Sequence, residues 1–525
     1  MENNKKVVYY SEFGAIGDGI SEDMGAIIKC HDYANANGCT VMADKGATYY
    51  IGETDGAYAT VMTDVDWQDA TFIIDDKIIG VESKSRTVDI FKMVRANPKK
   101  VYELDSDIIK KINENGGYKA GVTTNVGYAP GYPALLLVFN HEHTAYLRWG
   151  CHATGQPNPQ RELVVVDAEG NIDPNTAFLL DYDKVTRIEE YRNDDEPITL
   201  KGGTFITRAN AAPPVYTAYN RGLGFERANV TVKDTVHKIV DEGPYGAPYS
   251  GFIRWYSADN LLCENLTLQS HKSYKDYEYD EDGKVVAVHS IMGSYDIGGG
   301  LSTNIRFKDC VQSNFYKYEE KSIAYTEAEQ WGLMGTNYCK NLEYDNCIFS
   351  RLDAHAGVYN VHIKNSTISY IKLTGGGVAT IENTKVIAPE GQAIAFLELR
   401  CDYGSTWKGD IIIKDCEFIN WKYHSVFLTN VLWNNWPFGY TTYLPRYTID
   451  NLKIDKPTAK IHVFNHIARD TSIKVDREVL DDGTVNQNPM VLDTTVTIKN
   501  NKYGYVYEGT PNEYANPKIK IVEIK

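Results

Sequence analysis

A seven-residue motif that occurs four times between Asn304 and Asn383 constrains the fold more than any other feature of the sequence. The copies read NIRFKDC, NLEYDNC, NVHIKNS and VATIENT, and they restart after 37, 19 and 18 residues. Apolar and polar residues alternate within each copy, which is the period of a half-buried strand. An Asn or Asp then precedes a small Cys, Ser or Thr, and Asn and Asp accept the bent backbone at which a strand ends. Each copy therefore predicts one strand and one turn.

A strand and a turn that recur about every twenty residues are typical of a solenoid. The pattern reappears at Asn260–Asn265, Asp410–Asp415 and Thr495–Asn500. Two further short strands fit into each repeat, so each coil is expected to hold about three strands. The predicted fold class is all-β: a single-stranded right-handed parallel β-helix, with the Asn and Cys/Ser/Thr side chains stacked from coil to coil.

The length and net charge of the chain limit the folds and binding partners that are expected. At 525 residues the chain exceeds one compact core, which a solenoid accommodates by growing along its axis. A net charge of −16 argues against nucleic acid or an anionic membrane as partner. No run of 18 apolar residues occurs, so no membrane span is expected. Met1–Lys6 is not followed by an apolar stretch, so the chain as given has no signal peptide. We expect a cytoplasmic protein, or a secreted one if a native leader was removed.

The N-terminal segment Phe13–Gly52 predicts a cap. A Gly/Asp turn, FGAIGDG at Phe13–Gly19, leads to Ser21 as helix N-cap, an amphipathic helix and a strand at Thr40–Met42. A helix before the first coil covers the open end of a β-helix. The segment resembles the start of the pectate-lyase-like (pectin lyase fold) superfamily, although Cys39 and Asp44 stand where Gly and Pro are usual. The resemblance implies the fold but no single reaction, because that superfamily spans lyases, glycosidases, epimerases and phage tail proteins.

The texture of the sequence divides the chain into four parts. Residues 1–94 are expected to form the N-terminal cap and first coils, and residues 95–197 an inserted small antiparallel β subdomain. The main β-helix is predicted for 198–470, and C-terminal coils and a tail for 471–525. The helical piece in the insert is placed at Leu104–Asn115.

Two segments were considered as metal sites. The insert contains His141, His143, Cys151 and His152, which offers a zinc site as an alternative to a hairpin loop. The run Glu278-x-Asp280-x-Asp282-Gly283 resembles half of a calcium loop, but a hairpin explains it better. We expect no metal and no cofactor, with calcium as the weaker alternative.

Backward alignment from the motif places five segments on the same strand of successive coils: HSIMGSYDI, EQWGLMGTN, LDAHAGVYN, AIAFLELRC and YHSVFLTN. These segments hold residue types that are costly to bury without a partner. They are Tyr295, Asp296, Trp331, Asp353, His355, Glu398 and Arg400. They are predicted to line a surface trough rather than the core; the alternative is that the acidic residues are turn residues.

The trough predicts a carbohydrate-active enzyme. Carboxyl groups one or two coils apart have the separation that glycoside hydrolysis needs, so Asp296 and Asp353 are predicted as acid and base or nucleophile, with His355 assisting. The predicted substrate-binding residues are Tyr295, Trp331, Arg351, Tyr359, Lys372, Glu398 and Arg400. The first hypothesis is a glycoside hydrolase acting on a poly- or oligosaccharide. The alternatives are a polysaccharide lyase on the same groove and a noncatalytic glycan-binding β-helix of the phage tail or adhesin type. A homo-oligomer is a further expectation from the resemblance.

Overall fold

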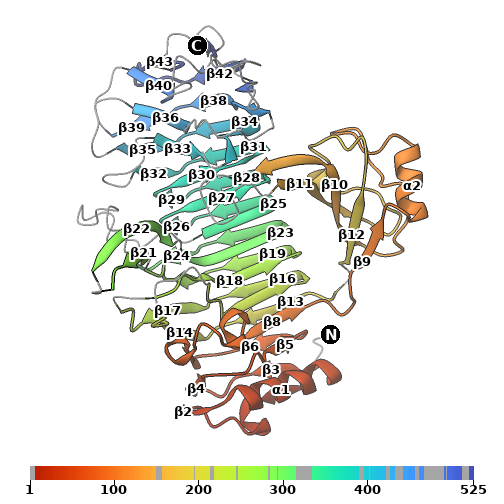
Figure 1. The fold of residues 1–525 in the computed structure, drawn as a ribbon, viewed down its shortest axis with the longest axis vertical. Coiled ribbons are helices and arrows are strands. Elements are labelled where there is room, and N and C mark those ends of the chain that lie inside the picture. The colour runs from red at the N-terminus through yellow and green to blue at the C-terminus, as the bar shows by residue number, and fades with distance from the viewer. Residues whose placement is uncertain are drawn as a thin grey trace.

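The chain winds into a right-handed parallel β-helix with a capping helix at its N-terminal end and a β subdomain on one side (Figure 1). The computed structural model describes residues 6–148, 157–193, 195–212, 218–243, 246–272, 274–281, 284–292, 294–314, 334–388, 395–400, 403–420, 426–431, 441–455, 460–465, 490–491, 493–510 and 519–524. Trp331 and the domain boundary predicted at residue 470 lie outside these residues.

Three columns of parallel strands form the wall of the β-helix. The chain passes through them in the same order in each coil, as in β27 (Leu352–Ala356), β28 (Val358–Lys364) and β29 (Thr367–Ile368). Columns one and two belong to a 24-stranded sheet, and column three is a 12-stranded sheet. The prediction of about three strands per coil is confirmed.

The strands of each column pair in parallel with the coil before and after. Column one comprises β5 (Ala59–Val61), β8 (Phe91–Val94), β15 (Leu223–Glu226), β18 (Ser250–Tyr256), the first part of β23 (Tyr295–Lys308), the first part of β25 (Met334–Asp345), β27, β30 (Ile371–Leu373), β33 (Ala395–Leu399), β36 (Val426–Val431), β40 (Lys460–Phe464) and β43 (Val506–Glu508).

Column two comprises β1 (Val7–Tyr9), β3 (Thr40–Met42), β6 (Val65–Asp66), β13 (Ile198–Lys201), β16 (Ala228–Lys233), β19 (Asp259–Glu264), the later parts of β23 and β25, β28, β31 (Gly375–Glu382), β34 (Trp407–Lys414), β38 (Arg446–Asp450), β42 (Thr494–Lys499) and β44 (Ile519–Ile524). Column three comprises β2 (Asp18–Glu22), β4 (Thr48–Ile51), β7 (Thr71–Asp75), β14 (Thr204–Arg208), β17 (Val236–Val240), β20 (Thr267–Leu268), β24 (Val311–Gln312), β26 (Ile348–Phe349), β29, β32 (Lys385–Ala388), β35 (Glu417–Asn420) and β39 (Lys453–Ile454).

The recurring Asn/Asp position turns the chain between columns two and three. Asp309, Asn346, Asn365 and Asn383 have φ of 55°, 53°, 52° and 45°, in the left-handed region that Asn and Asp tolerate. Their side chains bond from coil to coil: Asn346 Nδ2 donates to Asp309 Oδ1 at 2.6 Å, and Asn383 Nδ2 to Asn365 Oδ1 at 2.8 Å. The predicted ladder is therefore present, and the motif dictates the winding.

Helix α1 (Met24–Asn37) covers the first coil and buries Met24, Ile27 and Cys30. It begins later than predicted, because Ser21 belongs to strand β2 and Asp23 precedes the helix. The Asp23 carboxylate accepts the backbone N–H of Ile16 at 2.7 Å, so it fastens the preceding turn instead of capping the helix through its side chain.

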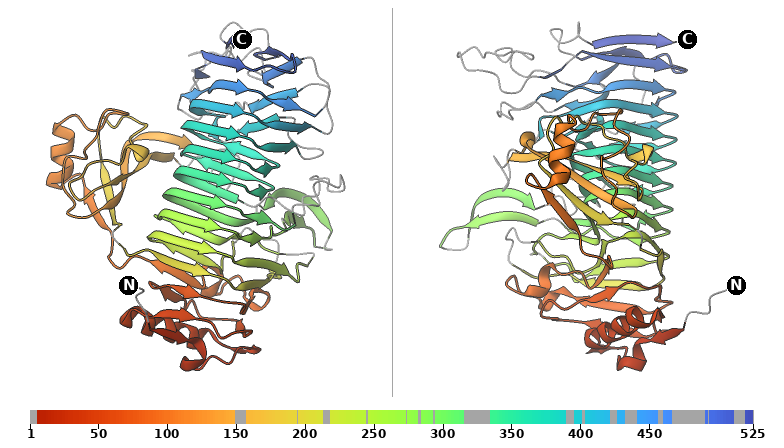
Figure 2. Two further views of the ribbon diagram at one scale, coloured as in Figure 1. Left: turned by 180° about the vertical axis from the view of Figure 1, so that it is seen from behind. Right: turned by 90° about the vertical axis from the view of Figure 1, so that its right-hand side faces the viewer.

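The insert leaves the coil after β8 and returns at β13, at the bend between columns one and two. Its antiparallel sheet has the order β11-β10-β12-β9, with β9 (Lys100–Glu103), β10 (Ala134–Leu147), β11 (Pro157–Val166) and β12 (Arg187–Arg192). Helix α2 (Asp107–Glu114) lies where sequence predicted it and helps to enclose a separate small core. Figure 2 shows the subdomain standing beside the coils.

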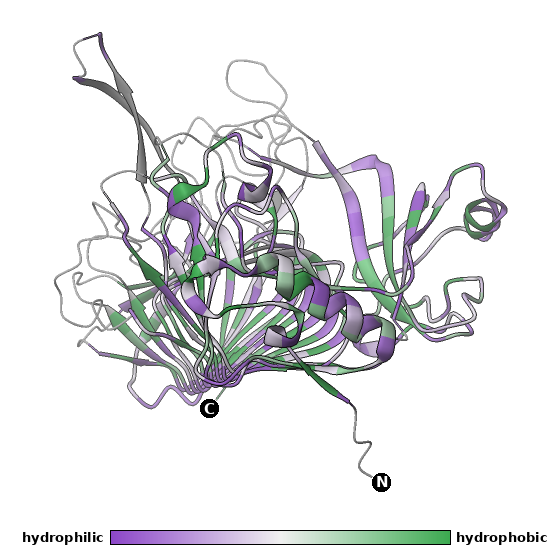
Figure 3. Cartoon of the chain, turned by 90° about the horizontal axis from the view of Figure 1, so that it is seen from below, coloured by the Kyte–Doolittle hydropathy of each residue, from purple (hydrophilic) through white to green (hydrophobic). Residues whose placement is uncertain are grey.

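Two contacts fasten the subdomain to the coils. One is an apolar cluster that includes Tyr146 and Leu163 of the subdomain and Tyr338 of the coils. The other is a buried ion pair in which Lys340 Nζ lies 2.6 Å from Glu162 Oε1. Seen along the axis, the subdomain projects from one flank of the stacked coils (Figure 3).

The remaining elements are short. A hairpin of β21 (Tyr274–Tyr279) and β22 (Val285–Met292) occupies the segment considered as a calcium loop, and Asp280 N–H donates to Lys284 O across its turn. Strands β37 (Thr442–Tyr443) and β41 (Met490–Val491) form a parallel pair. Single 3₁₀ turns occur at η1 (Tyr10–Phe13), η2 (Asp76–Ile78), η3 (Lys84–Thr87) and η4 (Pro174–Thr176). Within the described ranges, no helix is long and apolar enough to cross a membrane.

Candidate functional site

A groove of about 800 Å³ runs over the outer face of column one. Its floor is formed by β8, β15, β18 and β23. One wall comes from the subdomain, which contributes Arg148, Asn158 and Arg161. The opposite wall comes from connections that lead into column one and includes Thr87, Ala218 and Pro248.

Glycines lower the floor of the groove. Lys92, Gly224, Arg254 and Gly298 occupy one register position on four successive column-one strands. A Cβ atom on Gly224 would lie 2.6 Å from Oδ2 of Asp89. The Asp89 carboxyl group therefore rests on the backbone at Gly224, in space that any other residue would fill.

Asp89 is the most enclosed acidic side chain of the groove, with 5% of its surface exposed. Its Oδ2 lies 3.3 Å from an Arg254 guanidinium nitrogen. Burial raises the pKa of Asp89; Arg254 and Lys92 oppose that rise, and the charge of Glu226 adds to it. Asp89 can therefore retain a proton at higher pH than an ordinary aspartate.

Glu226 supplies a second carboxyl group nearby. It is the last residue of β15 and is exposed. Residues two apart on a strand face the same side, at roughly 6.6 Å between Cα atoms. Because Asp89 lies over Gly224, the two carboxyl groups are expected to share one face of the floor, and the charge of Glu226 acts on Asp89.

Aromatic side chains line the same groove. Tyr256, at the end of β18, is 50% exposed. Tyr338 and Tyr403 line the groove beneath Arg161 and Arg148, whose guanidinium carbons lie 3.9 Å and 5.4 Å from the respective ring centres. Flat rings beside hydrogen-bonding groups are suited to a ligand with an apolar face and a polar rim.

Tyr295 and His355 form a linked pair at one end of the groove. The Tyr295 hydroxyl lies 3.0 Å from His355 Nε2, and the same nitrogen is 3.4 Å from Asp353 Oδ2. Burial lowers the pKa of His355, and the Asp353 carboxylate opposes that effect. Both residues were predicted as site residues, and both line the groove.

Asp296 and Asp353 do not form the predicted acid/base pair. Asp296 is fully buried, and its Oδ1 lies 2.9 Å from Nδ1 of His237, whose ring stacks on the core residue Phe252. It points into the coil, whereas Asp353 reaches His355 at the groove. The aligned segments do contribute to column one, but not in successive coils, because β30 lies between β27 and β33. The register also places Gly298, not Asp296, in line with Asp353.

The charges around Asp353 neutralise one another. Arg351 bonds to Asp353 Oδ2, and Arg400 lies 2.7 Å from Asp353 Oδ1. Burial disfavours the ionised carboxyl group, but the two arginines outweigh it and hold the pKa of Asp353 well below its usual range. Lys372 Nζ lies 2.7 Å from Glu398 Oε1, and Tyr370 donates to the same carboxylate.

Arg351, Lys372, Glu398 and Arg400 therefore do not line the groove as predicted, because they serve a closed ionic network. Tyr359 lines a different cavity, on the other side of the contact between the subdomain and the coils. Trp331 lies outside the described residues. Sequence reasoning missed Asp89 and Glu226, because about a hundred inserted residues separate them and hide their register.

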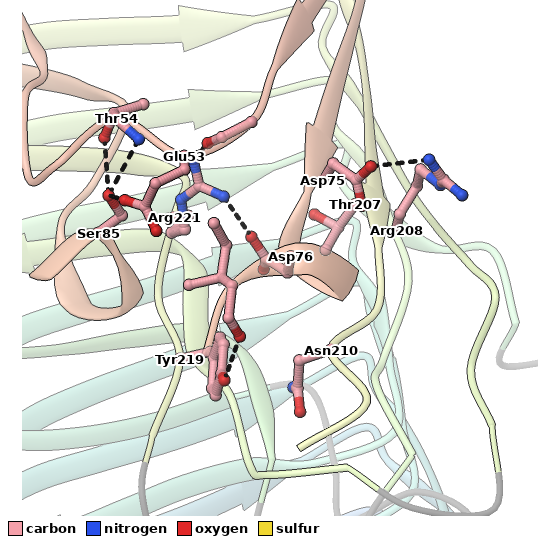
Figure 4. Close-up of polar contacts among 12 residues, drawn as sticks. Glu53, Thr54, Asp75, Asp76, Ser85, Thr207, Arg208, Asn210, Tyr219 and Arg221 are labelled. Carbon is pink, nitrogen blue, oxygen red and sulfur yellow. Dashed lines mark hydrogen bonds and ion pairs between the residues drawn. The ribbon is translucent and has the colours of Figure 1, made fainter. Parts of the chain in front are cut away.

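A buried polar network supports the N-terminal end of the groove (Figure 4). Arg221 and Asp76 are both buried and lie 2.9 Å apart, and Arg221 also donates to the Gly52 carbonyl. Tyr219 donates to the Ile79 carbonyl at 2.7 Å. These bonds tie the connection after β7 to the connection before β15, next to the groove residues Thr87 and Ala218.

No cluster of three His, Cys, Asp or Glu side chains that could hold a metal occurs in the part of the chain that the structure describes. His141 stacks on Phe139, and its Nδ1 lies 2.7 Å from the Thr186 hydroxyl. Cys151 and His152 lie outside the described residues.

Comparisons with known proteins identify the fold but no family. No protein-family model matches the chain, and no curated protein matches it in sequence. Among solved structures, the tailspike gp61 of Pseudomonas phage phi297 is similar with a TM-score of 0.50 and 11% identity, over 99% of this chain and 84% of that one. The tailspike gp49 of Pseudomonas phage LKA1 has a TM-score of 0.40 and 14% identity, over 92% and 84% of the two chains. The adhesin PfbA of Streptococcus pneumoniae has a TM-score of 0.39 and 12% identity, over 99% of this chain and 100% of that one. The first similarity establishes the right-handed parallel β-helix fold and nothing finer.

Proposed function

We propose that the protein is a carbohydrate-active enzyme that binds a poly- or oligosaccharide in the groove over column one and hydrolyses a glycosidic bond. The observation that carries the proposal is the placement of Asp89 and Glu226 on one stretch of the groove floor in different environments. Asp89 is enclosed and its pKa is raised, while Glu226 is exposed. A pair of carboxyl groups divided in this way is what glycoside hydrolysis requires.

Each residue has a defined role in the proposed reaction. Asp89, in its protonated form, gives its proton to the glycosidic oxygen as the bond to that oxygen breaks. Glu226, ionised, either activates a water molecule or attacks the sugar carbon directly. Tyr256 offers an exposed ring for a sugar face, and Lys92 and Arg254 donate hydrogen bonds to sugar oxygens.

The fold and the N-terminal motif agree with this proposal. The FGAIGDG segment at Phe13–Gly19 supports distant membership of the pectate-lyase-like superfamily.

The test is product analysis on a panel of polysaccharides with the wild type, Asp89→Asn and Glu226→Gln. Asp415→Asn, an exposed carboxylate in the Asn/Asp ladder, is the matched control. We expect new reducing ends without an unsaturated uronate from the wild type and the control, and a loss of roughly 10²- to 10⁴-fold in rate from either groove variant. Undiminished cleavage by both groove variants would refute the assignment of the carboxyl pair.

A second candidate is a polysaccharide lyase, favoured by the Tyr295–His355 pair. In that reaction His355 accepts the proton on the carbon beside the uronate carboxylate, the C–O bond to the neighbouring sugar breaks, and a carbon–carbon double bond forms. The departing sugar oxygen takes up a proton from the Tyr295 hydroxyl and leaves as an alcohol, and the Tyr295 oxygen regains a proton from His355. Tyr295→Phe separates the two reactions: it should abolish elimination and leave hydrolysis largely intact. Binding of a glycan without any cleavage would indicate a noncatalytic glycan-binding protein.

A further inference from the structure

A second cavity, of about 640 Å³, lies between the subdomain and the coils and is separate from the groove. Glu142, His143 and Asp181 line it from the subdomain, and Tyr359, Lys408 and Tyr443 from the coils. A cavity of this size falls within the usual range of roughly 300 to 1,000 Å³ for small-ligand pockets.

The coil side of this cavity repeats the construction of the groove floor. Tyr359, Gly376 and Lys408 occupy one register position on three successive strands, β28, β31 and β34. Gly376 in the middle carries no side chain, and a Cβ atom there would lie 2.6 Å from the Lys408 carbonyl oxygen. Gly376 therefore leaves a hollow between an aromatic and a cationic side chain, whereas Gly224 stands between two cationic ones, Lys92 and Arg254.

The polar groups of the cavity are available to a ligand. Lys408 is exposed, and its Nζ lies 5.3 Å from the ring centre of Tyr443. Asp181 is exposed, and its carboxylate accepts a hydrogen bond from the Ala120 backbone N–H at 2.9 Å. A cation, an acceptor and an aromatic face around one hollow fit a ligand with several hydroxyl groups and an apolar face.

One layer of rings separates the two cavities. Tyr146 lines the second cavity, while Tyr338 and Tyr403, whose ring centres lie 6.3 Å and 6.1 Å from that of Tyr146, line the groove. These three rings belong to the apolar cluster that holds the subdomain in place. The second cavity therefore does not belong to the groove, although the two are adjacent.

We propose that this cavity is a second sugar-binding site, which holds another unit of the polysaccharide that the groove binds. The proposal rests on the function proposed above. The sugar lies against Tyr443, and its hydroxyl groups contact Lys408 and Asp181. A second site of this kind raises the affinity for a polymer with many identical units without taking part in the chemistry.

The test uses saturation-transfer NMR with three free monosaccharides: galactose, N-acetylglucosamine and glucuronate. The proteins are the wild type, the cavity variant Lys408→Ala/Tyr443→Ala, the groove variant Tyr256→Ala and the combination of both. We expect the cavity variant to lose part of the signal, by about 5- to 10-fold weaker binding at its site, and only the combination to lose all of it.

The outcomes are distinct. A full wild-type signal from the cavity variant, or complete loss in the groove variant alone, would overturn the second site. A partial loss in the cavity variant with no effect of Tyr256→Ala would support the second site and count against the groove. No signal from the wild type would overturn both. Cleavage of short oligosaccharides by the cavity variant should match the wild type, which separates binding at the cavity from catalysis in the groove.

Discussion

The outer face of column one consists of two halves that differ in what their side chains do. The open half, at Lys92, Gly224, Arg254 and Gly298, is hollowed by glycines and forms the floor of the groove. The closed half continues the same register at Asp353, Lys372 and Glu398. There the charged groups are bonded to one another and largely buried.

The comparison shows that the half with more charged side chains, the closed half, is not the half proposed to bind substrate. In the closed half each carboxylate forms an ion pair with a cationic side chain, so its charge is already neutralised within the fold. In the open half Asp89 has one guanidinium partner and lies beside the exposed Glu226. An imperfectly neutralised carboxyl group at an open surface is the one with a pKa raised toward the range useful for proton transfer.

The largest effect is expected from a substitution that places a side chain on the glycine floor of the open half. Gly224→Val would place side-chain atoms where the Asp89 carboxylate lies, 2.6 Å from the position of a Cβ atom. Displacing a reacting group by about 1 Å costs roughly 10²-fold in rate, so we expect at least that loss of cleavage. The measurement is turnover, with circular dichroism to verify the fold. Thr199→Val, on the outer face of β13, is the control, and wild-type turnover by Gly224→Val would contradict this account of the floor.

In the closed half, the removal of one charge is expected to lower stability rather than activity. Asp353→Asn leaves Arg351 and Arg400 beside an uncharged amide, and breaking a buried ion pair typically costs about 3 to 5 kcal/mol. We expect the free energy of unfolding, measured by denaturant titration, to fall by that amount.

The matched variant in the open half is Asp89→Asn, which should lower the rate of cleavage by roughly 10²- to 10⁴-fold. It should cost less than about 1 kcal/mol of stability, because Arg254 stays partly solvated. The sequence alone assigned Asp353 a catalytic role as acid, base or nucleophile, which the ion pairs with Arg351 and Arg400 do not favour. Equal destabilisation by the two variants would remove the distinction between the halves.

Sequence reasoning succeeded where the cause is local. The Asn/Asp positions need a left-handed backbone and the strands need period-2 alternation, and both requirements are visible in a short window around Asn346. The coil order, the capping helix and the inserted subdomain follow from such signals.

The site was harder to predict because it depends on register and on partners. Whether Asp296 faces the core is decided by His237, which lies 59 residues earlier. Asp89 and Glu226 meet only because the insert between them folds out of the coil. The one local signal was the glycine run before Leu301, which marks the absence of side chains on the floor.

The pH dependence of cleavage tests how Arg254 affects the pKa of Asp89 in the open half. This arginine lowers the pKa of Asp89, so Arg254→Met should raise that pKa further above the ordinary aspartate value. Because the proposed general acid works in its protonated form, the alkaline limb of the pH–rate profile should move to higher pH. A shift of one pH unit, on the order expected for a close charge, corresponds to about 1.4 kcal/mol. A shift toward lower pH would show that Asp89 does not act as the acid.

The smallest expected effect lies in the Asn/Asp ladder, which follows the bend between columns two and three through the coils of both halves. Asn265 Nδ2 donates to Asp234 Oδ1 at 2.7 Å in a coil of the open half, and Asn383 Nδ2 donates to Asn365 Oδ1 at 2.8 Å in a coil of the closed half. Both residues are exposed and have positive φ, so Asn→Gly keeps the backbone and removes only the side-chain bond. Each variant should lower the free energy of unfolding by about 0.5 to 1.5 kcal/mol, and the two losses should agree. Agreement would confine the difference between the halves to their outer faces; a larger loss at Asn383 would mean that the ionic network of the closed half also stiffens the coil beneath it.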